Sequence, residues 1–181
     1  MNYGYVYTNI QSTSINFVPT DADYFNLQYA ERKKNETWSF DQSGRKVFYG
    51  DIHMHSAISD ATGTPDEVLA RAWVRGLDFA VLTDHDTVGG SRMLPSEYSE
   101  VAWTTDQFNT RSGFATLHAY EWTTPALPSG SGHKNVYFEE YGPTEPFTTG
   151  NGHPDTTSLY QKLRNEKAFA VPHHTPWTGV D

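Results

Sequence analysis

The sequence predicts an α/β fold, and three observations carry that prediction. Residues 47–52 are rich in β-formers and indicate a strand. Thr64-Pro65-Asp66-Glu67 has the composition of a helix start, with Thr as the N-cap, Pro at the first helical position and two acids in the first turn. Residues 78–82 are mostly apolar, follow Gly76 almost directly and predict a second strand. A strand, a helix and a strand in this order form a β-α-β unit over residues 47–82, which implies parallel strands and a right-handed crossover.

Further elements are expected along the rest of the chain. Apolar spacing predicts helices over residues 96–110 and 158–167, strands over 114–120, 134–138 and 168–172, and loops over 125–132 and 139–155. Residues 1–45 have scattered apolar positions and are rich in Asn, Thr, Ser, Tyr and Asp. We interpret them as an N-terminal arm or the tail of an upstream domain, and residues 46–181 as one domain.

Composition excludes several classes of function. The chain has 181 residues, with 22 acidic against 13 basic side chains and a net charge of −9, which disfavours nucleic acid and anionic membranes as partners. No apolar run approaches the roughly 20 residues that span a bilayer. No signal peptide is recognised, so the cytoplasm is the default expectation, and the oligomeric state is not predicted. The absence of cysteine excludes disulfides and thiolate zinc sites, whereas eight histidines and many acids are typical of a nitrogen- and oxygen-coordinated metal site.

The strongest motif is the pair His53 and His55 at the end of the first predicted strand. Side chains two apart on an extended segment point the same way, so the two imidazoles can reach one cation. Asp60 can fold back through the turn of residues 59–63 and add a carboxylate. An isolated His-x-His pair is a weak signal, and other polar clusters are needed to support it.

Such clusters recur at the ends of the other predicted strands. The second strand is followed by Asp84 and His85, the third by Glu121, and the fourth begins near His133. The fifth strand ends in the pair His173-His174. In parallel α/β folds the carboxyl ends of the strands meet at one rim, where active sites lie. Packing alone does not explain this repeated placement, and the sequence therefore predicts a metal site.

The order of these motifs resembles the PHP (polymerase and histidinol phosphatase) superfamily. The amino-acid sequences of two motifs, residues 50–56 and 172–175, most resemble the carbaryl-hydrolase-like branch of metallohydrolases. The resemblance covers roughly residues 47–177. It implies a distorted β/α barrel of seven strands with two or three divalent ions (Zn, Mn or Fe). The family closes its site with a late Asp-x-His pair that has no counterpart before Asp181. We therefore expect a fragment or a shortened version of the barrel, with an incomplete metal centre.

The resemblance also implies a role for each matching residue. His53 and His55 would bind one ion, Asp60 and His85 would help to hold a further ion, Glu121 would bridge two ions, and His133 and His173 would complete the neighbouring site. Asp84 is adjacent to His85 and can orient an imidazole from behind. His174 is expected to donate a proton to the leaving group or to face the substrate. The alternative proton donor is a site histidine that is not fully coordinated.

Such a centre predicts hydrolysis of a small-molecule ester by metal-bound hydroxide, with no serine or cysteine nucleophile. A phosphoester is the first expectation, because most relatives in the superfamily cleave phosphoesters. A carbamate or carboxyl ester is the alternative, because the carbaryl-hydrolase-like branch acts on a carbamate. Only Arg92 and Lys134 offer positive charge near the predicted rim. A non-catalytic metal-binding module is a third hypothesis, from a different class of protein.

Overall fold

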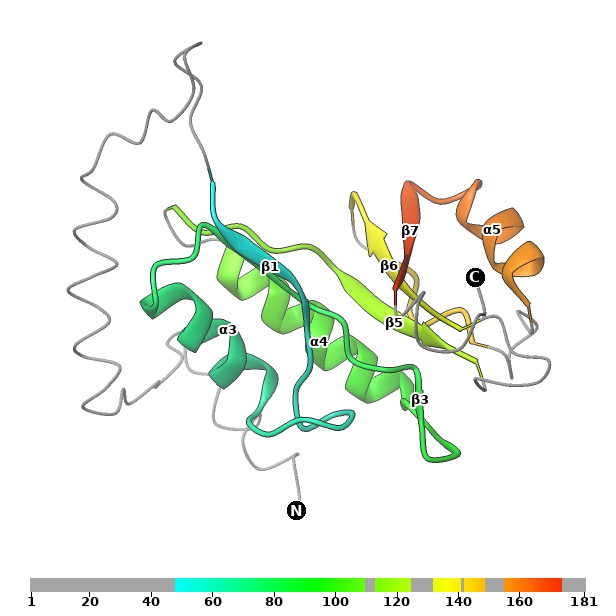
Figure 1. Cartoon of the computed structure of the whole chain (residues 1–181), viewed down its shortest axis with the longest axis horizontal. Helices are drawn as coiled ribbons and strands as arrows, with labels where there is room; N and C mark the ends of the chain where they lie inside the picture. Colours follow the sequence, from blue (N-terminus) through cyan, green and yellow to red (C-terminus); the bar gives the residue numbers. More distant parts are fainter. Residues whose placement is uncertain (1–47, 110–112, 125–131, 141, 149–154, 174–181) are drawn as a thin grey trace, which may run out of the picture.

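The computed structural model describes residues 48–109, 113–124, 132–140, 142–148 and 155–173 of the chain (Figure 1). The predicted arm of residues 1–45 and the predicted site residue His174 lie outside these ranges. The helices and strands are β1 (Gly50–Met54), α3 (Pro65–Val74), β2 (Phe79–Leu82), β3 (Thr87–Val88), β4 (Ser91–Arg92), α4 (Pro95–Asn109), β5 (Ala119–Thr123), β6 (His133–Phe138), α5 (Thr156–Leu163) and β7 (Ala168–His173). Within the described ranges no helix is long and apolar enough to cross a membrane.

The predicted β-α-β unit is confirmed. Strand β1 pairs with β2 in parallel, with Asp51 opposite Ala80. Helix α3 begins after Thr64, whose backbone N–H donates to the Glu67 carboxylate at 3.0 Å and so satisfies a group that the first helical turn leaves open. Gly76 follows the helix with a φ of +83°, a conformation that glycine adopts without strain. This unit places the end of β1 beside the end of β2.

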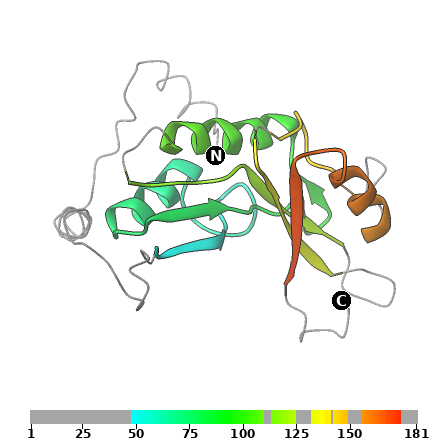
Figure 2. The same cartoon turned by 90° about the horizontal axis from the view of Figure 1, so that it is seen from above.

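Helices α3 and α4 pack over the same side of the two parallel strands (Figure 2). Their apolar faces share one buried cluster with the strands, whose members are Leu69, Ala70, Ala72, Ala80, Leu82, Val101, Phe108 and Phe114. Burying such side chains stabilises the fold by about 1.5–3 kcal/mol each relative to exposure, for the larger ones. The two helices thus cover one face of the β1-β2 pair and hold these strands in place, while the polar residues that follow the strands lie outside this apolar cluster.

A second sheet has the order β5-β6-β7 and is antiparallel throughout. On one face lie Tyr120, Trp122, Val136 and Phe138, which form a core with Tyr98 of α4 and with Leu159 and Leu163 of α5. Residues directly opposite share a face, so Glu121 and Asn135 lie together on the other face. An isolated parallel bridge between His85 and Glu121 joins this sheet to the segment after β2.

The structure differs from the sequence-based expectations in three places. The strand expected over residues 114–120 begins only at Ala119, because Phe114 is buried against the helices and the backbone N–H of Thr116 donates to Asn109 Oδ1 at 2.8 Å. The strand expected at residues 134–138, whose direction was not predicted, begins at His133 and is antiparallel to both neighbours. The hairpin β3–β4 was not predicted; its turn is Gly89-Gly90, with φ of +56° and +86°.

The α/β class is confirmed, whereas the closed barrel is not part of what the structure describes. Three separate sheets, β1-β2, β3-β4 and β5-β6-β7, are present in the described ranges. Closure into a seven-stranded barrel therefore stays a prediction from the resemblance. The antiparallel direction of β6 has a consequence for the site, since it places the beginning of β6 beside the ends of β5 and β7.

Candidate metal centre

Glu121 lies at the middle of the predicted site and is completely buried. Four imidazoles surround its carboxylate: His53 and His55 from β1 and the loop after it, His85 from the loop after β2, and His133 from the beginning of β6. The side chains of these histidines are 12–31% exposed. A buried carboxylate among partly exposed imidazoles is a polar centre with one side open to solvent.

One half of the centre is a triangle of three atoms. His53 Nε2 and His55 Nε2 lie 3.0 Å apart, and each lies 3.0 Å from Glu121 Oε2. Donors at right angles around one ion with bonds of about 2.1 Å are about 3.0 Å apart. The spacing therefore matches three adjacent ligands of a single divalent ion.

The other oxygen of Glu121 faces the second pair of histidines. His133 Nδ1 lies 2.5 Å and His85 Nδ1 lies 3.4 Å from Glu121 Oε1. Each carboxylate oxygen thus has its own group of nitrogen atoms. This division is the arrangement that a carboxylate bridging two ions requires.

Asp60 reaches the centre through the turn that the sequence predicted. The backbone N–H of Ala57 donates to Gly63 O at 2.7 Å and closes the turn. Asp60 Oδ1 then lies 3.1 Å from His55 Nδ1, and its Oδ2 lies 3.6 Å from His85 Nε2. Its side chain is 52% exposed, so Asp60 stands at the open side of the centre.

Two hydroxyl groups determine which imidazole nitrogens carry protons. Ser59 donates its hydroxyl proton to Asp84 Oδ1 at 2.7 Å and lies 3.2 Å from His55 Nδ1. With its own proton committed, the Ser59 oxygen accepts the N–H of His55 Nδ1. The lone pair of His55 is then on Nε2, which faces Glu121 and His53.

Thr123 acts in the same way on His85. Its hydroxyl donates to the backbone oxygen of Glu121 at 3.1 Å and lies 2.8 Å from His85 Nδ1. His85 Nδ1 therefore donates to Thr123, and the lone pair on Nε2 faces Asp60. A neutral imidazole offers one lone pair, so this tautomer associates His85 with Asp60.

The electrostatic environment shifts the pKa values of His55 and His85 in opposite directions. Burial acts to lower the pKa of His55, but the hydrogen bond to Glu121 and the charges of Glu121, Asp60 and Asp84 together raise that pKa above its usual 6.5. For His85, burial outweighs the attraction of Glu121, and its pKa falls. His85 is accordingly neutral near pH 7, which is the form that binds a metal.

Asp84 lies behind the centre and contacts no imidazole directly among the residues that the structure describes. Its carboxylate is fully buried and accepts from the backbone N–H and the hydroxyl of Ser56 at 2.7 and 2.8 Å, besides the hydroxyl of Ser59. The sequence suggested that Asp84 orients an imidazole. In the structure Asp84 acts on His55 indirectly, because it accepts the hydroxyl proton of Ser59, whose oxygen lies beside His55 Nδ1. This role of Ser59 was not predicted from the sequence. The available signal was a small hydroxyl residue close in sequence to the histidines.

A second buried carboxylate, Asp86, was also missed. It is fully buried, and its Oδ1 accepts the backbone N–H of Thr123 at 2.7 Å. Burial raises the pKa of Asp86 to about 7, although the hydrogen bonds to Thr123 oppose this shift. Asp86 ties the loop after β2 to the end of β5, and so holds His85 next to Glu121.

Three residues singled out in the sequence remain to be placed, namely His173, Arg92 and Lys134. The backbone of His173 pairs with that of His133 at the end of β7, which puts both positions at the same edge of the sheet. Of the two cationic candidates, Arg92 is exposed and its Nη2 donates to Thr148 at 2.7 Å, whereas Lys134 is buried in β6.

Comparisons with known proteins give partial likenesses. A family model described as a protein of unknown function (DUF3604) matches residues 90–177. The chain is similar to a 5'-3' exoribonuclease of Haemophilus influenzae, with 42% identity over 40 residues, and to a 3',5'-nucleoside bisphosphate phosphatase of Chromobacterium violaceum, with 50% identity over 40 residues. Each alignment covers 22% of this chain, and 15% and 14% of the respective relative.

The fold is similar to part of one solved structure. That structure is a two-domain protein of Bacteroides vulgatus containing a predicted PHP-like metal-dependent phosphoesterase. The TM-score is 0.51 at 21% identity, over 74% of this chain and 37% of that protein. The chain therefore spans less than two-fifths of this neighbour and a small part of the curated relatives.

The donor set fits divalent ions. Three groups of side chains each bring one ligand atom per residue within 4.8 Å of the others: His53, His55 and Glu121; His55, Asp60 and His85; and His85, Glu121 and His133. Because the lone pair of His55 is on Nε2, which faces His53 and Glu121, His55 belongs to the first of these groups. Asp60 and His85 then remain as the two ligands of the second group. Imidazole nitrogen and carboxylate oxygen in this ratio suit Zn, Mn or Fe rather than Ca.

Proposed function

We propose that this chain carries the metal centre of a metal-dependent phosphoesterase that acts on small-molecule phosphoesters. The observation that carries the proposal is the buried carboxylate of Glu121, whose Oε2 lies 3.0 Å from Nε2 of His53 and of His55 and whose Oε1 lies 2.5 Å from His133 Nδ1. The likeness in fold to a PHP-like phosphoesterase and the local similarity to a bisphosphate phosphatase support the same class.

The proposed ligand set follows from the tautomers and distances. His53, His55 and Glu121 would hold one ion, and Glu121 with His133 would hold a second. Asp60 and His85 hold a further ion or complete the first two. His173 is proposed as an additional ligand beside His133, because the two positions pair across β6 and β7.

The chemistry of the site follows from its charges. Divalent ions at such a centre lower the pKa of water and neutralise negative charge on a phosphoryl oxygen. Without them, Glu121 and Asp60 would repel a phosphate, so binding and turnover both require the ions. Asp84 is proposed to position His55 through Ser59, and His174, which follows β7 directly, is the proposed proton donor to the leaving group.

The test is reconstitution followed by a substrate panel. The protein is stripped with a chelator, reloaded separately with Mn, Zn or Fe, and assayed with para-nitrophenyl phosphate, bis-para-nitrophenyl phosphate, a naphthyl carbamate and a single-stranded oligonucleotide. Turnover of a phosphoester by the reloaded protein, with loss in Glu121→Gln but not in the surface variant Glu166→Gln, is expected.

Each alternative has its own outcome in that panel. Turnover of the carbamate alone would favour the carboxyl- and carbamate-ester hypothesis over the phosphoesterase. Cleavage of the oligonucleotide would contradict the expectation, drawn from the net charge, that nucleic acid is no partner. Tight binding of metal without turnover of any substrate would identify a non-catalytic metal-binding module. Failure to take up metal would refute the centre itself.

A further inference from the structure

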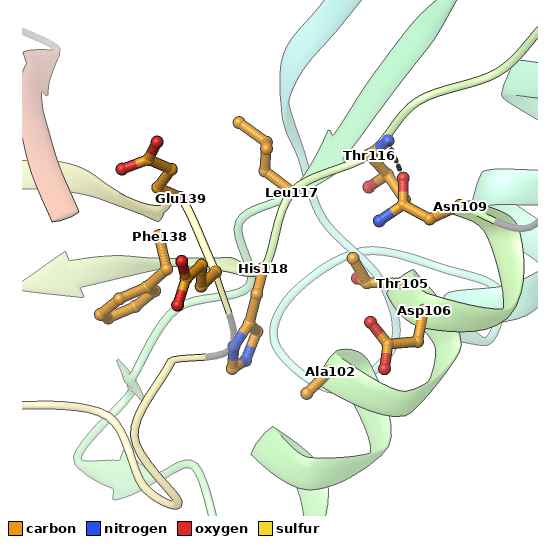
Figure 3. A pocket seen from close by; sticks show the side chains of 10 residues that line it. Ala102, Thr105, Asp106, Asn109, Thr116, Leu117, His118, Phe138 and Glu139 are labelled. Carbon is orange, nitrogen blue, oxygen red and sulfur yellow. Dashed lines mark hydrogen bonds between the residues drawn. The ribbon is translucent and has the colours of Figure 1, made fainter. Parts of the chain in front are cut away.

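A second polar cavity lies away from the metal centre. Its volume is about 160 Å³, and it is enclosed by the second half of α4, the segment of residues 116–118 and the end of β6 with the two residues that follow (Figure 3). It is larger than a single water molecule, whose share of the liquid is about 30 Å³. None of the residues of the candidate metal centre lines it. A ligand here would be separate from the proposed substrate.

Two buried hydroxyl groups line this cavity without a hydrogen-bond partner in the described part of the chain. They belong to Thr105, which is 2% exposed, and to Thr116, which is 4% exposed. Leaving a buried hydroxyl without a hydrogen-bond partner is costly, because its desolvation is not repaid. Two such groups on the wall of one cavity indicate that its contents, rather than the protein, complete their hydrogen bonds.

The charge on the cavity wall is negative. Asp106, Glu139 and Glu140 contribute carboxylates, and Glu140 forms an ion pair with Lys167, whose charge also acts on Glu139. One lysine thus faces two of these carboxylates, and Asp106 has no lysine or arginine partner among the described residues. Phe138 adds an aromatic surface (Figure 3). This excess of negative charge disfavours an anionic ligand and attracts a cation.

His118 cannot supply the missing positive charge. Its ring is 7% exposed and stacks between Tyr98 and Phe138, and its Nδ1 accepts the backbone N–H of Gly142 at 2.9 Å. A side chain at Gly142 would collide with this ring, since a Cβ atom there would lie 2.7 Å from Nδ1. Burial lowers the pKa of His118 to about 4, so the ring is neutral near pH 7.

The lining also distinguishes between kinds of cation. A divalent metal needs several ligand atoms close together, yet no group of three histidine or acidic side chains around this cavity brings its ligand atoms within 4.8 Å, in the ranges that the structure describes. Carboxylates and hydroxyls that stand further apart are better bridged by a cation that carries several N–H groups. An aromatic wall adds a cation–π contribution.

We propose that this cavity binds a small organic cation bearing N–H donors, of the alkylguanidinium or alkylammonium class. Asp106 and Glu139 balance the charge, Thr105 and Thr116 accept N–H groups, and Phe138 packs against the carbon atoms. The proposal is independent of the proposed function, because neither the metal centre nor its activity enters the argument.

The test is a titration of the full chain with methylguanidinium chloride at constant ionic strength, followed by NMR of the backbone amides. The amides of Gly142 and Thr116 should shift and saturate. Tetramethylammonium, which has the same charge and no N–H donor, should produce no saturable shift. Asp106→Asn should raise the dissociation constant about tenfold or more, since a hydrogen bond to a charged group is lost.

A pair of neighbouring threonines provides the matched control. Thr105→Val removes a hydroxyl from the cavity and should weaken binding several-fold. Thr104→Val removes an equally buried hydroxyl, also without a partner, that does not line the cavity, and it should leave binding unchanged. Shifts that do not saturate, equal binding of tetramethylammonium, or equal weakening by both valine variants would overturn the proposal and leave a cavity that holds water only.

Discussion

Thr123 offers the sharpest test of the tautomers in the metal centre. Its hydroxyl accepts from His85 Nδ1 at 2.8 Å and donates to the backbone oxygen of Glu121 at 3.1 Å. Thr123→Val keeps the branched shape that suits a strand and keeps the backbone N–H that donates to Asp86. The variant therefore removes one hydroxyl, with its hydrogen bonds to His85 and to the carboxylate of Asp86, and keeps the backbone bond that holds the strand to Asp86.

The expected effect is on metal affinity. Without Thr123 the proton of His85 can move to Nε2, which removes the lone pair that faces Asp60. Partners that orient a metal-binding histidine contribute about 10- to 100-fold to metal affinity, equivalent to about 1.4–2.7 kcal/mol. We expect a loss in that range for the ion held by His85, measured by titration against a competing chelator.

The neighbouring threonine separates this effect from a general loss of stability. Thr124 donates its hydroxyl to Gly132 O at 2.9 Å, is 3% exposed, and contacts no imidazole through that bond. Thr124→Val and Thr123→Val should each lower the free energy of unfolding by about 1 kcal/mol. Only Thr123→Val should lower metal affinity, and equal metal affinities in the two variants would refute the reasoning.

Three further predictions concern other parts of the molecule. His53→Ala combined with His55→Ala should lower the metal content by about one equivalent in elemental analysis, and an unchanged ratio of metal to protein would remove both from the centre. Glu121→Gln should lower the occupancy of two ions together and reduce any hydrolysis by orders of magnitude, whereas near-normal metal content would exclude a bridging carboxylate. Because the folded pKa of His118 lies below its unfolded value near 6.5, the unfolded chain binds more protons, and stability should fall by about 2 kcal/mol from pH 7 to pH 5. Denaturant titrations should show a smaller fall in His118→Gln, and identical pH dependence in both proteins would contradict the assignment.

Local patterns in the sequence were sufficient to predict the parallel unit, and they also singled out side chains that lie together around Glu121, whose role as metal ligands stays a prediction. The capped start at Thr64, the apolar run before Asp84 and the two-residue spacing of His53 and His55 each act within a few residues, where side-chain direction follows from backbone geometry. The turn that carries Asp60 back to His55 is also local, and the structure contains it.

Tertiary structure decided what lies behind and beside those ligands. The antiparallel direction of β6 depends on pairing with β5 and β7, and it brings His133, at the beginning of a strand, beside Glu121. The hydroxyls of Ser59 and Thr123 acquire their roles only because Asp84 and Glu121, distant in sequence, accept their protons. The alternation of side chains along a strand determines which face each side chain points to, and this can be predicted from the sequence. The residue that accepts or donates its hydrogen bond depends on how the strands pack against one another, which only the tertiary structure determines.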